Sequence, residues 1–189
     1  MCIRDSNRTE RYDKSSPISE YDYHLETPLK ATFSGAFVIA KKGLISVDYE
    51  YLNYGKAKLR NGGDGYNFGD ENMDISKAYK AAGNLRIGGE YVVNNSISLR
   101  GGYEFHPSAY NSLAFEATQP NANADLMVYS AGLGYRSGLF FADVAYRYSV
   151  IDNFESPYPT PQSDFYPAPK TIAFNTVKNN ILFTLGYKF

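Results

Sequence analysis

The chain has 189 residues, which suits one domain of ordinary size or a piece of a larger one. Its formal net charge of −1 excludes an electrostatic case for nucleic-acid binding, and its single cysteine excludes an internal disulfide. The 18 Tyr, 12 Phe and 16 Gly residues, with no Trp, favour strands over helices.

The N-terminal stretch MCIRDSNRTERYDKSS has neither the apolar core nor the small-residue cleavage site of a signal peptide. The protein is therefore either cytosolic or lacks its true N-terminus. The opening MCIRDS matches no pattern downstream and is a candidate artefactual start. No run of 18 apolar residues occurs in the sequence, so no transmembrane helix is predicted.

Seven segments alternate apolar and polar residues, as strands with one apolar face do. They are residues 29–41, 44–54, 84–93, 96–106, 125–136 and 138–149, and a C-terminal strand from Ile181 to Phe189. On the last of them Phe183 and Leu185 alternate with Thr184 and Gly186. Because the pattern repeats in every segment, it predicts an all-β, antiparallel protein.

The connections between these segments alternate in length. KKG, NN and RSG join the first and second, third and fourth, and fifth and sixth segments, and suit tight hairpins. The other connections are long and lie at roughly residues 55–83, 107–124 and 150–178. Within the first of these, ENMDISKAYKAAG predicts a short helix with Asp74 as a candidate N-cap and Gly83 just past its end. Short turns at one end and long external loops at the other are typical of a transmembrane β-barrel.

The side chains on each face decide between a barrel and a soluble sandwich, since both alternate. The polar face mixes small residues with charges of both signs, and no charge interrupts the middle of an apolar face. Strands of about 9–11 residues match the hydrocarbon layer, and tyrosines at strand ends fit an interfacial girdle. The pattern therefore predicts an antiparallel transmembrane β-barrel with its apolar face against outer-membrane lipid.

Seven strands cannot close such a barrel alone. Bacterial single-chain barrels have even strand numbers, and an open sheet in lipid would leave unpaired N–H and C=O groups at its edges. We therefore interpret residues 29–189 as the C-terminal part of a larger outer-membrane barrel and residues 1–28 as the remnant of an external loop or strand.

Two stretches carry a family resemblance. TPLKATFSGAFVIAKKGLISVDYEYLNYGKAKL (27–59) and AYKAAGNLRIGGEYVVNNSISLRGGYEF (78–105) resemble the FadL-type long-chain fatty acid and hydrocarbon transporters, particularly those of Bacteroidetes outer membranes. The terminal ILFTLGYKF is similar to the C-terminal strand signature by which such barrels reach the barrel assembly machinery. The resemblance implies a barrel of about fourteen strands with a small N-terminal hatch, of which this chain supplies half the strands. It also implies transport of hydrophobic compounds, with long-chain fatty acids foremost, across the bacterial outer membrane without a cofactor.

A fatty acid in such a barrel needs an apolar lining for its tail and a cation for its carboxylate. Arg86, Arg100 and Arg147 lie on the predicted lumen face and are the candidate cations. In the alternative reading they pair across strands with lumen carboxylates and hold the wall together. Those carboxylates are Glu90, Glu104, Asp143, Asp48 and Glu50. The candidate ligand-binding set comprises Arg86, Arg100, Arg147, Glu90, Glu104 and Asp143.

No other motif predicts chemistry. Residues 156–170 hold five prolines among aromatic residues, which suits either an apolar external landing surface or a stiffened loop. The acidic, Gly-rich residues 61–72 do not match an EF-hand series, and His24 and His106 belong to no metal-spaced cluster. Without a G-x-S-x-G or a Walker loop, no enzyme is predicted. The alternative to a transporter is a non-transporting outer-membrane barrel, an adhesin or a structural porin.

Overall fold

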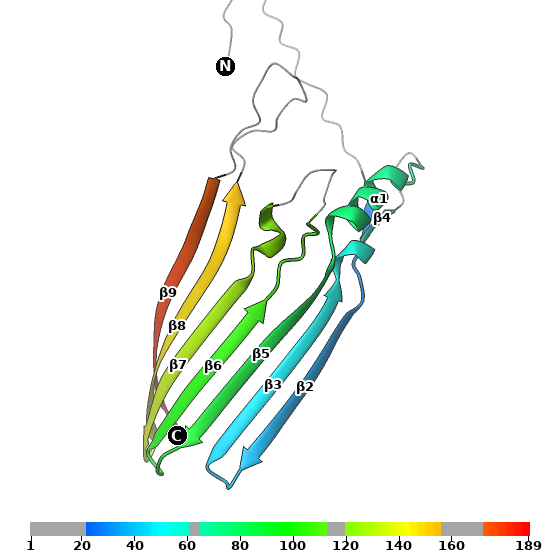
Figure 1. The fold of residues 1–189 in the computed structure, drawn as a ribbon. Coiled ribbons are helices and arrows are strands. Elements are labelled where there is room, and N and C mark those ends of the chain that lie inside the picture. Colours follow the sequence, from blue (N-terminus) through cyan, green and yellow to red (C-terminus); the bar gives the residue numbers. More distant parts are fainter. Residues whose placement is uncertain (1–21, 61–64, 113–119, 156–171) are drawn as a thin grey trace, which may run out of the picture.

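The computed structural model describes residues 22–60, 65–112, 120–155 and 172–189 (Figure 1). Seven strands form one antiparallel sheet in the order β2-β3-β5-β6-β7-β8-β9, so the strand order follows the chain. The strands are β2 (Lys30–Ile39), β3 (Gly43–Asn53), β5 (Ala81–Val92), β6 (Ile97–His106), β7 (Leu126–Ser137), β8 (Phe140–Glu155) and β9 (Ile172–Tyr187). In Figure 1 they run side by side as a single layer.

All seven predicted strands are confirmed, but the lengths of the last two were wrong. The sequence predicted a loop over residues 150–178, whereas β8 continues to Glu155 and β9 begins at Ile172. The register pairs Val150 with Val177 and Glu155 with Ile172, so the two strands form a hairpin that continues past the end of β7. Backbone hydrogen bonds in that hairpin satisfy groups that a loop would leave to water.

The smaller elements gather at one end of the sheet, the upper end in Figure 1. Strand β1 (His24–Glu26) pairs with β4 (Lys58–Arg60) as a separate two-stranded sheet, next to η1 (Tyr54–Lys56) and α1 (Gly69–Ala78). The 3-10 turn η3 (Pro120–Asn123) precedes β7. The C-terminus and the short turns lie at the opposite end. This arrangement confirms the predicted asymmetry of long and short connections.

The β2–β3 hairpin shows how a short turn is built. Ala40 and Lys41 both have positive φ, 49° and 59°, and the Lys42 N–H donates to the Ile39 carbonyl at 3.0 Å. Two central residues with positive φ make the turn that matches the right-handed twist of the flanking strands. At the β7–β8 turn Gly138, with φ 58°, supplies the same conformation without a Cβ clash.

The predicted helix exists, but its predicted ends were wrong. Its N-cap is Phe68, with φ 53°, and the Asn67 side chain accepts a hydrogen bond from the Gly69 N–H at 3.0 Å. Asp74 lies inside the helix rather than capping it. Gly83 lies in β5, where an added Cβ would come within 2.5 Å of the Tyr49 hydroxyl, so it makes room for that side chain instead of ending the helix.

The face predicted to be apolar is exposed along the sheet. Phe37 is 69% exposed, Leu133 46% and Phe183 78%, so these side chains are not covered by a second layer within the described residues. The buried apolar side chains are few, and Val128, on the opposite face of β7, is the largest fully buried one described. None of the described helices is long and apolar enough to cross a membrane.

Candidate functional site

The strand register keeps the two faces separate over the whole sheet. Cross-strand partners connect one row from β2 to β9, and every member except Gly43, which the sequence predicted to lie in a turn, comes from a face predicted to be apolar. In strand order the row is Ile39, Gly43, Tyr91, Leu99, Leu133, Val144 and Phe183. We call this the outer face and the opposite one the inner face. All six candidate ligand-binding residues lie on the inner face, because in each strand they alternate with the residues of the outer face.

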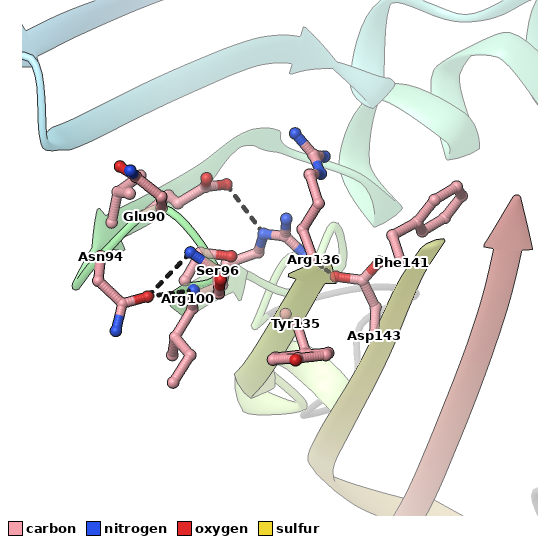
Figure 2. Close-up of a pocket in the computed structure, with 13 residues that line it drawn as sticks. Glu90, Asn94, Ser96, Arg100, Tyr135, Arg136, Phe141 and Asp143 are labelled. Atoms are coloured by element: carbon pink, nitrogen blue, oxygen red, sulfur yellow. Dashed lines mark hydrogen bonds and ion pairs between the residues drawn. The ribbon is translucent and has the colours of Figure 1, made fainter. Parts of the chain in front are cut away.

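Arg100 forms the best-connected cluster on the inner face. Its Nε donates to Glu90 Oε2 at 2.8 Å and its Nη1 to Asp143 Oδ1 at 2.6 Å (Figure 2). Glu90 is its cross-strand partner on β5, whereas Asp143 lies on β8, two strands away. A guanidinium held by two carboxylates from different strands ties three strands together.

A small pocket lies beside this cluster at the short-turn end (Figure 2). Its volume is about 90 Å³, and Arg136 and Phe141 are among its lining residues. The neighbouring β5–β6 turn is held by Asn94 Oδ1, which accepts hydrogen bonds from the Ser96 and Ile97 N–H groups at 2.8 Å each. Ligand pockets usually enclose about 300–1,000 Å³, so this pocket suits a few water molecules rather than a lipid tail.

Arg147 is paired more weakly. Its Nη2 lies 3.7 Å from Glu104 Oε2, which also lies 3.2 Å from His106 Nε2. Glu104 is on β6 and Arg147 on β8, so this pair, like Arg100–Asp143, crosses β7. Arg100 and Arg147 therefore fit the alternative prediction, in which the arginines pair with carboxylates across strands and stabilise the sheet.

Arg86 differs from the other two. It is half-buried, and its cross-strand partners are Asp48 on β3 and Glu104 on β6. None of the ion pairs found among the described residues includes it. The nearby Glu50, only 8% exposed, is bound instead by Lys30 Nζ at 2.6 Å and by Asn84 Nδ2 at 2.9 Å. Arg86 is thus the one candidate arginine without an ion pair among the described residues.

The sequence reasoning also missed inner-face cations, Arg136 on β7 and Lys178 on β9. Lys178 occupies the same cross-strand row as Arg86, Glu104 and Ser149. It is exposed, and no ion pair in the described part of the chain involves it. It was missed because the segment before residue 179 was interpreted as a loop. The signal that could have found it is its spacing of five residues from Phe183, which puts it on the opposite face of one strand.

Metal binding finds no support in the part of the chain that the structure describes, where no three His, Cys, Asp or Glu side chains group to hold an ion. Residues 61–64 of the acidic segment and the proline-rich residues 156–170 lie outside the described residues. The interpretations of those two loops therefore stay predictions.

Comparisons with known proteins agree with the fold. A family model described as outer membrane protein transport protein (OMPP1/FadL/TodX) matches residues 18–189. Among solved structures, the chain is similar to the crystal structure of a Pseudomonas aeruginosa FadL homologue, with a TM-score of 0.54 and 17% identity. That match covers 86% of this chain and 36% of the homologue, so the chain spans little more than a third of that protein's length. No curated protein matches the chain.

Proposed function

Because the chain belongs to the OMPP1/FadL/TodX family of outer membrane transport proteins, we propose that it forms part of the wall of a barrel that carries hydrophobic compounds across the bacterial outer membrane. The cargo class that we propose is long-chain fatty acids. Strands β2 and β9 have no further partner in the described sheet, and an edge left open in lipid would leave backbone groups unsatisfied. The proposal therefore includes further strands that close the barrel. It includes no enzymatic activity, since the family's description is one of transport.

The observation that supports a hydrophobic cargo is the exposure of apolar side chains on the segments at the long-loop end. Leu25 on β1 is 59% exposed and Met73 on α1 is 49% exposed, with Tyr23 and Tyr66 also exposed. The segments that bear them lie above the sheet, away from the membrane-spanning length of the strands (Figure 1). Apolar side chains exposed outside the spanning strands favour contact with an apolar partner. A hydrophobic compound arriving from outside the cell would meet these side chains first.

We further propose that Arg86 binds the carboxylate of a fatty acid inside the barrel. Arg100 is held by two carboxylates and Arg147 by one, so neither is as available to a ligand. Arg86 has no ion pair of its own among the described residues, and Lys178 adds a second unpaired cation in the same row. A guanidinium can hold a carboxylate by two parallel hydrogen bonds.

The test is uptake of a labelled long-chain fatty acid by cells that express the complete barrel protein in place of their own transporter. The double variant Leu25→Asp and Met73→Asp removes two of the exposed apolar side chains and is expected to reduce uptake severalfold. Ser76→Asp, a change at another exposed position of the same helix, is the control and is expected to leave uptake unchanged.

Unchanged uptake in the double variant would contradict capture by these side chains. If the unaltered protein takes up no fatty acid and no other hydrophobic compound, transport itself is wrong. The non-transporting barrel, an adhesin or structural porin, would then be the better account.

A further inference from the structure

The outer face carries a groove at its short-turn end. The groove has a volume of about 600 Å³ and is lined by Ile39, Ile45, Tyr91 and Leu99, with glycines of β5 and β6 between them. Gly89 and Gly101 are cross-strand partners, so two neighbouring positions of the wall lack side chains. A Cβ added at Gly89 would find its nearest atom at 3.6 Å and one at Gly101 at 3.9 Å, in both cases a backbone oxygen. No side chain of the described residues fills the space over these glycines.

A second, polar hollow adjoins this groove. It also measures about 600 Å³ and lies between the β2–β3 and β5–β6 turns, where Lys41, Lys42 and Asn95 are among its lining residues. The two hollows share Ala40 and Lys42 as lining residues, so they lie next to each other. The Val92 N–H donates to the Lys42 carbonyl at 2.7 Å, which holds the first turn against β5. The polar hollow therefore has a fixed position beside the apolar groove.

Among the described residues, no ion pair neutralises the charge of the polar hollow. Lys41 and Lys42 are both exposed, and neither takes part in an ion pair in the described ranges. Two lysines that line the same hollow, with side-chain amides among the other lining residues, complement an anion that has several acceptor oxygens, as a phosphate diester has. Lysines at a membrane surface attract anionic lipid headgroups.

We propose that these two hollows bind one anionic phospholipid of the leaflet at the short-turn side. Its phosphate lies at Lys41 and Lys42, and one acyl chain lies over Gly89 and Gly101. Inside a bilayer the acyl chain gains nothing from leaving water, so preference for this place comes from the fit of the chain in the groove and from the charge pair. The site differs from the cargo path, because it lies on the outer face.

The test compares lipids retained by the complete barrel protein in nanodiscs that contain phosphatidylglycerol and phosphatidylethanolamine in equal amounts. Native mass spectrometry counts the bound lipids. We expect one retained phosphatidylglycerol, preferred about tenfold over phosphatidylethanolamine. The variant Gly89→Leu with Gly101→Leu fills the groove, and the variant Lys41→Gln with Lys42→Gln removes the charge. Each is expected to lower retention of phosphatidylglycerol about tenfold.

Gly35→Leu is the matched control for the groove, because Gly35 lies on the outer face of β2 with no atom within 4 Å of an added Cβ. Lys56→Gln with Lys58→Gln, at the long-loop end, is the control for charge. Heat-modifiable migration on gels checks that each variant folds. The proposal is overturned if the site variants keep the lipid or if the controls lose it as the site variants do. It is also overturned if both lipids are retained equally, or if a free fatty acid is retained instead. Fatty-acid uptake is expected to be unchanged in all four variants, so failure here leaves the proposed function untouched.

Discussion

Arg100 on β6 donates a hydrogen bond of 2.6 Å to Asp143 on β8, although β7 lies between the two strands. The two side chains can meet across β7 because the inner-face residues of β7 between them are Gly132 and Gly134. A Cβ added at Gly134 would lie 2.6 Å from Ser98 Oγ and 2.7 Å from Asp143 Oδ1. The missing side chains on β7 are therefore what lets charges on its two neighbours meet.

Gly134→Ala is expected to destabilise the barrel by about 1–3 kcal/mol, because the new methyl group displaces the Asp143 carboxylate. Gly101→Ala is the matched control, since its Cβ would find nothing closer than 3.9 Å. The control should be neutral or gain about 0.4–1 kcal/mol from a less flexible unfolded chain. Urea unfolding of the complete protein in lipid vesicles measures both. Equal stability of the two variants would contradict the role given to Gly134.

Substitution of Arg100 is expected to lower stability, whereas substitution of Arg86 is expected to weaken ligand binding. Arg100→Ala leaves Glu90 and Asp143 without their partner and should lower the free energy of unfolding by about 1–2 kcal/mol. Arg86→Ala should leave stability unchanged and weaken fatty-acid binding about tenfold, or about 1.4 kcal/mol. Urea unfolding and titration with a fluorescent fatty acid give the two quantities. If Arg100→Ala weakens binding at unchanged stability, the two roles are assigned the wrong way round.

The faces of the strands could be predicted from the sequence because the period of two is contained within each strand. The ends of β8 and β9 could not, because polar residues such as Asn175 and Asn179 occupy outer-face positions in that part of the hairpin. There the alternation that identifies a lipid-facing strand is lost, although backbone pairing continues. The helix ends were missed for a similar reason, since Phe68 is an unusual N-cap for which no propensity argues.

The candidate site was predicted as a set of residues but not as a set of pairs. The alternation of polar and apolar residues placed Arg100 and Asp143 on the same face of the sheet. From that placement the arginines could either bind a ligand or pair with carboxylates across strands. Which carboxylate meets which arginine depends on the register over three strands and on the glycines of β7. Neither the register nor the effect of these glycines can be read from the sequence of a single strand. The structure was therefore needed to show that Arg100 is paired with carboxylates and that Arg86 has no ion pair among the described residues.

The Asn121 side chain, in η3, hydrogen-bonds backbone groups of β8 beyond the end of β7. Its Nδ2 donates to the Phe154 carbonyl and its Oδ1 accepts from the Phe154 N–H, both at 2.9 Å. Asn121→Ala removes both bonds, so the Phe154 amide should exchange with solvent about tenfold faster, which corresponds to about 1.4 kcal/mol. Hydrogen exchange of the complete protein measures this rate. Asn123→Ala, in the same turn, is the control, and unchanged protection in Asn121→Ala would show that other contacts hold this strand.

We expect the outer face to contact lipid and the inner face to line an enclosed, hydrated interior. This expectation is tested most directly by spin labels on single cysteines in the complete protein in a bilayer, with the one native cysteine, Cys2, replaced by Ser. Labels at Leu133 and Phe183 report the outer face, and labels at Ser130 and Thr184 report the inner face. We expect oxygen dissolved in lipid to relax the outer pair and a water-soluble nickel complex to relax the inner pair. The reverse pattern, or equal access of the nickel complex to all four labels, would contradict it.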